Sequence, residues 1–111
     1  MKYKLDILPR AINDIRAIAE WWSQYRSTEQ AGRWLSRIES AIAGLAMDPD
    51  KHPAASESDQ FTFDLQELRF GLRNSKTHRV VFAIRGNTVR IYAVRHLAQD
   101  FLTQEDIETI E

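Results

Sequence analysis

Apolar and polar positions alternate at the start of the chain and then change to a helical period. In KYKLDIL, residues 2–8, the apolar Tyr3, Leu5 and Ile7 alternate with charged residues, which is typical of a half-buried strand, and Pro9 ends the alternation. From about residue 10 to 25, and again from Ser27 onward, apolar side chains recur every three or four positions. The pattern predicts two amphipathic helices, the second capped by Ser27 with Gln30 three positions further on.

The second half of the chain returns to period two. A polar loop over 49–62 is followed by the stretch 68–72, in which apolar and basic residues alternate. The apolar stretches 79–84 and 89–94 flank Gly86-Asn87, a favourable two-residue hairpin turn with glycine first. Because these two stretches are apolar on both faces, we expect them at the centre of the sheet.

The order of elements predicts an α+β fold. An N-terminal strand is followed by an antiparallel helical hairpin, which packs on one face of an antiparallel sheet completed by a three-stranded meander. A short C-terminal helix is expected over 103–110, with Thr103 as its cap. The whole chain, 1–111, is expected to form a single domain. The other face of the sheet is expected to be available for a partner.

The composition narrows the class of protein. With 43% hydrophobic and 28% charged residues, the 111-residue chain has the composition of a globular protein. It contains no cysteine, which excludes disulfides and thiolate chemistry. No apolar run approaches the roughly 18 residues of a membrane span, and the N-terminus lacks the apolar stretch of a signal peptide. We therefore expect a cytoplasmic protein with no membrane partner.

Charge is segregated along the chain. Residues 1–67 hold 8 Lys/Arg against 11 Asp/Glu, residues 68–99 hold 7 against none, and residues 100–111 hold none against 5. A basic block between acidic segments favours an anionic partner or an acidic segment of another chain. The alternative is that the acidic segments of the same chain neutralise the block within the fold.

The basic residues of the block have different expected positions. Arg79 and Arg95 start and finish the hairpin strands at the same end of the sheet, and alternation places Arg69 and Arg73 on one face, where they would add to that end. Arg85 and Arg90 flank the turn and are expected to be solvated. With Lys76, such a group is typical of phosphate binding.

Aromatic residues favour packing over ligand stacking. The three tryptophans, Trp21, Trp22 and Trp34, are expected at the helix interface, although the consecutive Trp21 and Trp22 cannot both face inward. The strand aromatics Phe70 and Tyr92 stand at positions suited to the core.

Known catalytic signatures are absent from the sequence. There is no glycine-rich phosphate loop, no GxSxG and no HExxH. The histidines at 52, 78 and 96 share no metal-ligand spacing, so we expect neither a metal nor another cofactor. His96 follows Arg95 at the end of the last strand, where a group that titrates near neutrality suits general acid or base chemistry. An ordinary surface histidine is the alternative.

The chain resembles toxins of the RelE/ParE superfamily from bacterial type II toxin–antitoxin modules. The resemblance rests on PRAINDIRAIAEWW, RWLSRIESAIAGLAMDPDKHP, LQELRF, HRVVFAIRGNTVRIYAVRH and AQDF, in this order over nearly the whole length. It implies a small cytoplasmic protein that a cognate antitoxin neutralises in a toxin–antitoxin hetero-oligomer. Peptide binding over a sheet face or a helix pair would explain such neutralisation.

The residues also favour one branch of the superfamily. RelE-like toxins cleave mRNA on the ribosome, and usually carry an arginine just after the last strand and a tyrosine near the C-terminus. Those places fall here on Leu97 and Phe101, which cannot stabilise a phosphorane charge or exchange a proton. ParE-like toxins, which poison DNA gyrase, lack the nuclease set and commonly end the sheet as Arg95-His96 does. The chain resembles these more.

Two functions of different class follow from the resemblance. The first is a binding-type inhibitor of DNA gyrase with no catalytic residue, which contacts its target or antitoxin through Arg69, Arg73, Arg79, Arg95 and His96. The second is a ribosome-dependent mRNA endoribonuclease in which Arg73, Arg79 and His96 hold and activate the RNA phosphate, because Arg79 and His96 match positions that the nucleases use.

Overall fold

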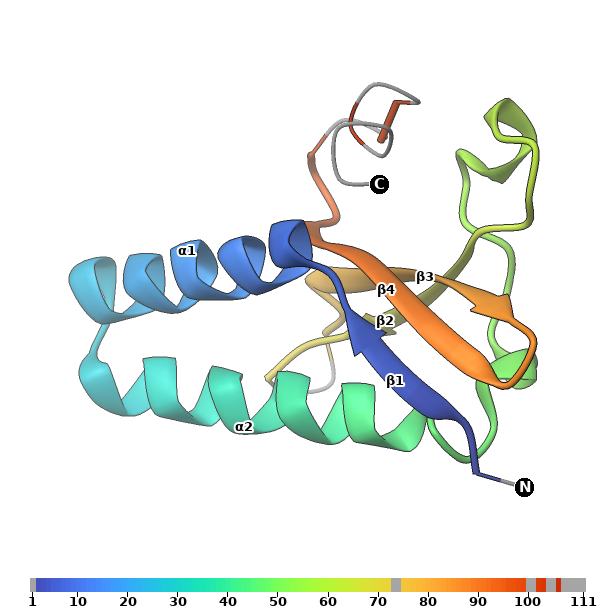
Figure 1. Cartoon of the computed structure of the whole chain (residues 1–111). Helices are drawn as coiled ribbons and strands as arrows, with labels where there is room; N and C mark the ends of the chain where they lie inside the picture. The colour runs from blue at the N-terminus through green and yellow to red at the C-terminus, as the bar shows by residue number, and fades with distance from the viewer. Residues whose placement is uncertain (1, 73–74, 100–101, 104–105, 107–111) are drawn as a thin grey trace.

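The computed structural model describes residues 2–72, 75–99, 102–103 and 106. Strand β1 (Lys4–Ile7) leads into helix α1 (Pro9–Tyr25), and helix α2 (Thr28–Gly44) runs back beside it as an antiparallel hairpin (Figure 1). Pro9 occupies the first turn of α1, where its missing N–H costs nothing. The Ser27 hydroxyl accepts the backbone N–H of Gln30 at 3.1 Å, which confirms the predicted cap of α2.

The sheet has four strands in the order β1-β4-β3-β2. The strands β2 (Gln66–Phe70), β3 (His78–Arg85) and β4 (Thr88–His96) form the antiparallel meander, and β1 pairs in parallel with β4. The central place predicted for the two apolar strands is confirmed. Gly86 has a φ of 61°, the left-handed conformation that a glycine-first hairpin turn requires.

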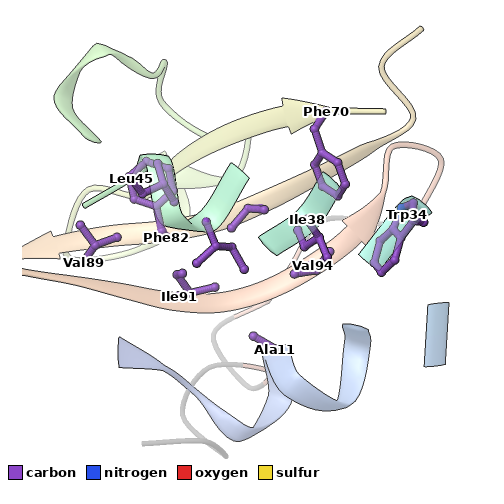
Figure 2. Packing of buried hydrophobic residues seen from close by; sticks show 11 residues of the cluster. Ala11, Trp34, Ile38, Leu45, Phe70, Phe82, Val89, Ile91 and Val94 are labelled. Carbon is purple, nitrogen blue, oxygen red and sulfur yellow. The ribbon is translucent and has the colours of Figure 1, made fainter. Parts of the chain in front are cut away.

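The main core lies between the helical hairpin and one face of the sheet. Figure 2 shows side chains of α1 and α2 directed at the strands, with Trp34 and Leu45 fully buried. Burial of each large apolar side chain contributes about 1.5–3 kcal/mol. The buried cluster consists of Ala11, Trp34, Ile38, Ile42, Leu45, Phe70, Val80, Phe82, Val89, Ile91 and Val94.

The opposite face of the sheet is covered at its centre, and the prediction that this face is available is wrong there. At the centre of β3 and β4, the side chains that point away from the helices are apolar, and the segment between α2 and β2 packs over them. That segment contains two 3₁₀ turns, Pro49–Lys51 and Ser58–Gln60. It pairs with β2 where Ala54 lies opposite Gln66, and Glu67 N–H donates to Pro53 O at 3.0 Å. The second cluster consists of Ala55, Leu65, Val81, Ala83, Tyr92, Ala93 and Leu102, with Leu8, Phe61 and Phe63 packed against it.

A bulge in β4 allows two consecutive residues to join this second cluster. Val81 pairs with Ala93 and Phe82 pairs with Ile91, so that Tyr92 has no partner across the ladder. The extra residue lets both Tyr92 and Ala93 contact the loop side, while Ile91 stays on the helix side. Tyr92 is buried, as the sequence predicts.

The boundaries of β2, β3 and β4 differ from the predicted ones, and two of the differences affect the candidate site. Strand β2 ends at Phe70 instead of continuing to residue 72, because the chain turns at Gly71, where any Cβ would collide with the Ser75 carbonyl. Strand β3 begins one residue early, so His78 belongs to the sheet and not to the preceding turn. Most of the predicted helix 103–110 lies outside the described residues.

Thr103 and Asp106 exchange hydrogen bonds, with Thr103 N–H to Asp106 Oδ2 at 2.8 Å and Asp106 N–H to Thr103 Oγ1 at 3.3 Å. This reciprocal pattern is that of a helix cap, and it agrees with the predicted role of Thr103. In the described part of the chain, no helix has the length and apolarity needed to cross a bilayer.

Candidate interaction surface at the open end of the sheet

The meander brings candidate residues together in two neighbouring rows across three strands. In the arginine row, Arg69 pairs with Arg79 and Arg79 pairs with Arg95. The histidine row lies one residue closer to the end of the sheet on each strand. In it, Phe70 pairs with His78 and His78 pairs with His96. Paired residues share a face and successive residues alternate, so the two rows lie on opposite faces. Arg73 lies outside the described residues.

Arg79, at the centre of the arginine row, is bound inside the protein. Its guanidinium donates to both oxygens of Glu57 at 2.7 Å each and to Glu67 Oε1 at 3.1 Å. Only 4% of Arg79 is exposed, and Glu57 is fully buried. The second oxygen of Glu57 also accepts the backbone N–H of Leu102 at 2.8 Å. One ion pair thus joins the loop, the sheet and the segment after β4.

The electrostatics of this group favour its charged form. Burial acts to raise the pKa of the Glu57 carboxyl, but the hydrogen bonds from Arg79 and Leu102 outweigh it and hold the pKa below its ordinary value. The hydrogen bonds to Glu57 raise the pKa of Arg79 against the effect of burial. The structure therefore corrects the interpretation of Arg79 as an accessible cation: it is a buried, neutralised one.

Other arginines of the basic block also have partners from acidic segments. Arg69, which is half exposed, donates to Glu67 Oε2 at 2.6 Å. Arg90 was predicted to be solvated, and its side chain is 35% exposed, but it also lies 3.5 Å from Asp6 on β1. Arg85 is exposed as predicted, with its guanidinium 4.4 Å from the centre of the Phe63 ring. Neutralisation within the fold accounts for much of the block.

Arg95 lies at the edge of the arginine row, in a mixed charge environment. The charged groups that act on it are Arg10, Asp14, Asp106 and Arg79. Burial, followed by repulsion from Arg10, lowers the pKa of Arg95. Of the C-terminal acids, Asp106 pairs with Arg10 at 3.1 Å.

Asp14 accepts a hydrogen bond from the backbone of β4 next to Arg95. Strand β1 pairs with β4 only as far as Ile91, and Asp14 Oδ2 accepts the N–H of Val94 at 3.0 Å beyond that point. Burial raises the pKa of Asp14, against the effect of this hydrogen bond.

The histidine row has a different character. His78 is buried among aromatic rings, with ring centres 5.4 Å from Trp34, 5.7 Å from Phe70 and 5.1 Å from His96. Burial, and then the neighbouring His96, lowers the pKa of His78 to about 4. The His78 ring is therefore uncharged at neutral pH. A 2.8 Å hydrogen bond between its Nδ1 and the Thr77 hydroxyl holds it in place.

His96 is exposed at the end of β4, as expected for either of its two interpretations. Its Nδ1 accepts the backbone N–H of Ala98 at 3.0 Å, and its own N–H donates to Gln99 Oε1 at 2.7 Å. When the ring is neutral, the acceptor role of Nδ1 places its proton on Nε2.

A pocket of about 430 Å³ opens beside the histidine row. Its walls come from the C-terminal half of α1 and from the ends of β3 and β4. Trp21, which lines the pocket, is 44% exposed, and its ring centre lies 5.7 Å from that of Tyr25, which is 59% exposed. The residues that line it include Ile18, Trp21, Trp22, Arg26, His78 and His96. The predicted division of the tryptophans is confirmed, since Trp34 and most of Trp22 are buried.

The sequence analysis predicts neither the pairing of Glu57 and Glu67 with the arginine row nor the place of His78 in the histidine row. Glu67 and Arg69 are two apart in a strand, which places them on one face, and this signal was available in the sequence. Glu57 lies in an irregular loop, 22 residues before Arg79, and no periodicity relates the two.

Comparison with known proteins identifies the class to which this architecture belongs. The family model described as "ParE toxin of type II toxin-antitoxin system, parDE" matches residues 5–101. The chain therefore belongs to the ParE toxin family of type II toxin–antitoxin systems. A solved chain from the chromosomal ParDE toxin–antitoxin system of P. aeruginosa is similar in fold, with a TM-score of 0.68 and 16% identity over 86% of this chain and 96% of that one. No curated protein matches.

Proposed function

We propose that this single-domain toxin inhibits DNA gyrase in the cytoplasm by binding it, and that a cognate antitoxin neutralises the toxin. Membership of the ParE family supports the toxin role, and the ParDE context of the similar solved chain supports an antitoxin partner. Gyrase as the target comes from the resemblance to ParE-like toxins, with Leu97 and Phe101 where nucleases of the superfamily carry reactive side chains.

The observation that carries this choice is the burial of Arg79. In the ribonuclease alternative, Arg79 holds the RNA phosphate, which requires its guanidinium to face the substrate. Here Glu57 occupies both ends of that guanidinium, and Glu67 shares one of them. Exchanging these charge-assisted bonds for a phosphate would leave the fully buried Glu57 carboxylate without a cation, which is strongly unfavourable. The alternative retains His96 alone as an accessible group among its described candidates.

The proposed contact region is the end of the sheet, with Arg69 and Arg95 on one face and His96 on the other. These residues carry the exposed or partly exposed polar groups of the two rows. Basic residues there would suit an acidic antitoxin segment and an anionic patch of the target. Arg79 supports this surface from within, because its row neighbours Arg69 and Arg95 lie on either side of it.

The function is tested by inducing the protein in a bacterial host and labelling thymidine and methionine incorporation side by side within minutes. Gyrase inhibition predicts an early stop in DNA synthesis while translation continues. With purified gyrase, the protein is expected to block supercoiling and to increase cleaved DNA complexes. Early loss of methionine incorporation with intact gyrase activity would instead support the ribonuclease.

Matched variants test the contact region. Arg95→Gln with His96→Gln removes polar groups from the end of the sheet, and is expected to reduce gyrase inhibition at least about tenfold. Arg16→Gln, on the exposed side of α1, is the control and is expected to retain inhibition. Equal inhibition by both variants would place the contact region elsewhere.

A further inference from the structure

The pocket beside the histidine row combines features of a protein-binding site. Trp, Tyr and Arg are the residue types that dominate binding energy at interfaces. Trp21 and Arg26 line the pocket, and Tyr25 packs against Trp21 beside it. Trp21 and Tyr25 are two of the few large apolar or aromatic side chains that are exposed in the described part of the chain. Exposed aromatic groups at the rim of a concave apolar site indicate an interaction surface.

The shape of the pocket is fixed by packed side chains. Trp22 packs edge-on against Trp21, with ring centres 5.4 Å apart, and His78, which lines the pocket, contacts the rings of Trp34 and Phe70. The Arg26 guanidinium lies over the Trp21 ring, 5.3 Å from its centre, and donates to the Tyr25 carbonyl at 3.1 Å. A rigid site binds a side chain without first having to order its own walls.

The charge of the residues that line the pocket favours an acidic partner. Arg26 and His96 stand on the rim, and the described residues that line the pocket include no aspartate or glutamate. An apolar side chain flanked by carboxylates would therefore find a buried surface for its apolar part and a cation for its acid. A basic peptide would place like charges next to Arg26.

We propose that this pocket binds a leucine or phenylalanine side chain from an acidic peptide segment of a partner protein. The proposal rests on the proposed function in one respect, since it takes the antitoxin as the source of that segment. The pocket volume of about 430 Å³ holds more than one such side chain.

The test uses the full chain labelled with ¹⁵N and three peptides without tryptophan. The probes are Ac-EDLFDE-NH₂, Ac-EDAADE-NH₂ and Ac-KKLFKK-NH₂, and the readout is the indole N–H resonances of the three tryptophans. The first peptide is expected to shift the resonances of Trp21 and Trp22 in a saturable manner, with Trp34 unchanged. The other two are expected to bind at least about tenfold more weakly, because each lacks the apolar or the acidic part.

Three variants place the binding site. Arg26→Glu reverses the charge of the rim and is expected to weaken Ac-EDLFDE-NH₂ at least about tenfold. Ala17→Phe fills the pocket from its exposed lining residue Ala17 and is expected to have the same effect. Arg16→Glu makes the same charge change on α1 outside the lining, and is expected to bind as the natural sequence does.

Several results would overturn the proposal. They are the absence of a saturable shift, equal shifts at Trp34, equal binding of Ac-EDAADE-NH₂, or equal weakening by Arg26→Glu and Arg16→Glu. Failure here is distinct from failure of the proposed function. A chain that binds none of the peptides but arrests gyrase would refute the pocket alone, and one that binds the peptide without affecting gyrase would refute the gyrase target alone.

Discussion

The arginine row and the histidine row lie one residue apart on the same three strands, and they use polar side chains in opposite ways. In the arginine row, the central Arg79 is charged, and carboxylates from outside the basic block surround it. In the histidine row, the central His78 is uncharged at neutral pH, and aromatic rings surround it. A basic sequence therefore does not by itself make a basic surface, because another segment of the chain can cover the face that carries the charges.

The largest effect is expected from breaking the buried ion pair. Glu57→Gln leaves the Arg79 guanidinium with Glu67 alone, and an under-compensated buried charge costs about 3–5 kcal/mol of the free energy of unfolding. Urea denaturation measures the loss. Asp59→Asn, at an exposed position of the same loop, is the control and is expected to change stability by less than about 0.5 kcal/mol. Equal stability of the two variants would mean that the pair is not a structural element.

The histidine row is expected to weaken the fold in acid. The pKa of His78 falls from its ordinary 6.5 to about 4 in the folded protein. The unfolded chain thus binds the proton more readily, so the contribution of His78 is complete above pH 6.5 and is lost as the pH falls toward 4. The loss amounts to about 3 kcal/mol over that window.

His78→Phe separates this contribution from those of the carboxylates. The variant keeps an aromatic ring between Trp34 and Phe70 but cannot take up a proton. Its free energy of unfolding, measured by urea denaturation between pH 4 and 7, is expected to vary less with pH than that of the natural sequence. Identical pH profiles would contradict a neutral, buried His78.

The smallest effect is expected at the exposed end of the arginine row. Arg69→Ala removes a half-exposed ion pair with Glu67, while Glu67 keeps its bond to Arg79. Because solvent screens such pairs, the loss of stability is expected to be about 1 kcal/mol or less. A loss as large as that of Glu57→Gln would show that the row acts as one unit and not as a buried pair with an exposed neighbour.

The sequence predicted the elements because each has a local signal. The Ser27 cap, the proline that begins α1 and the glycine-first turn at Gly86 act within a few residues, and the structure confirms all three. The central place of β3 and β4 followed from their apolar faces. The predicted strand starts only at residue 79, because polar residues precede it, and the ladder with Phe70 and His96 is what makes His78 part of the strand.

The burial and ion pairing of the candidate residues depend on contacts between segments that are distant in the sequence. The shared end of Arg79 and Arg95 followed from the hairpin, and their register confirms it. The partner of Arg79 did not follow, because Glu57 reaches it from a loop whose path is set by packing on Tyr92 and Ala93. Counting charges along the sequence shows that acidic residues are present elsewhere in the chain. It does not show which basic residue each of them pairs with.

The most direct test of the account asks whether Arg79 is needed for anything besides the ion pair. The double variant Glu57→Gln with Arg79→Met removes both buried charges, keeps an acceptor for the Leu102 N–H and leaves Glu67 paired with Arg69. Growth arrest is measured after induction in a bacterial host, together with the amount of folded protein. We predict that the variant folds and arrests growth as the natural sequence does. A folded variant that no longer arrests growth would show that Arg79 itself acts on the target.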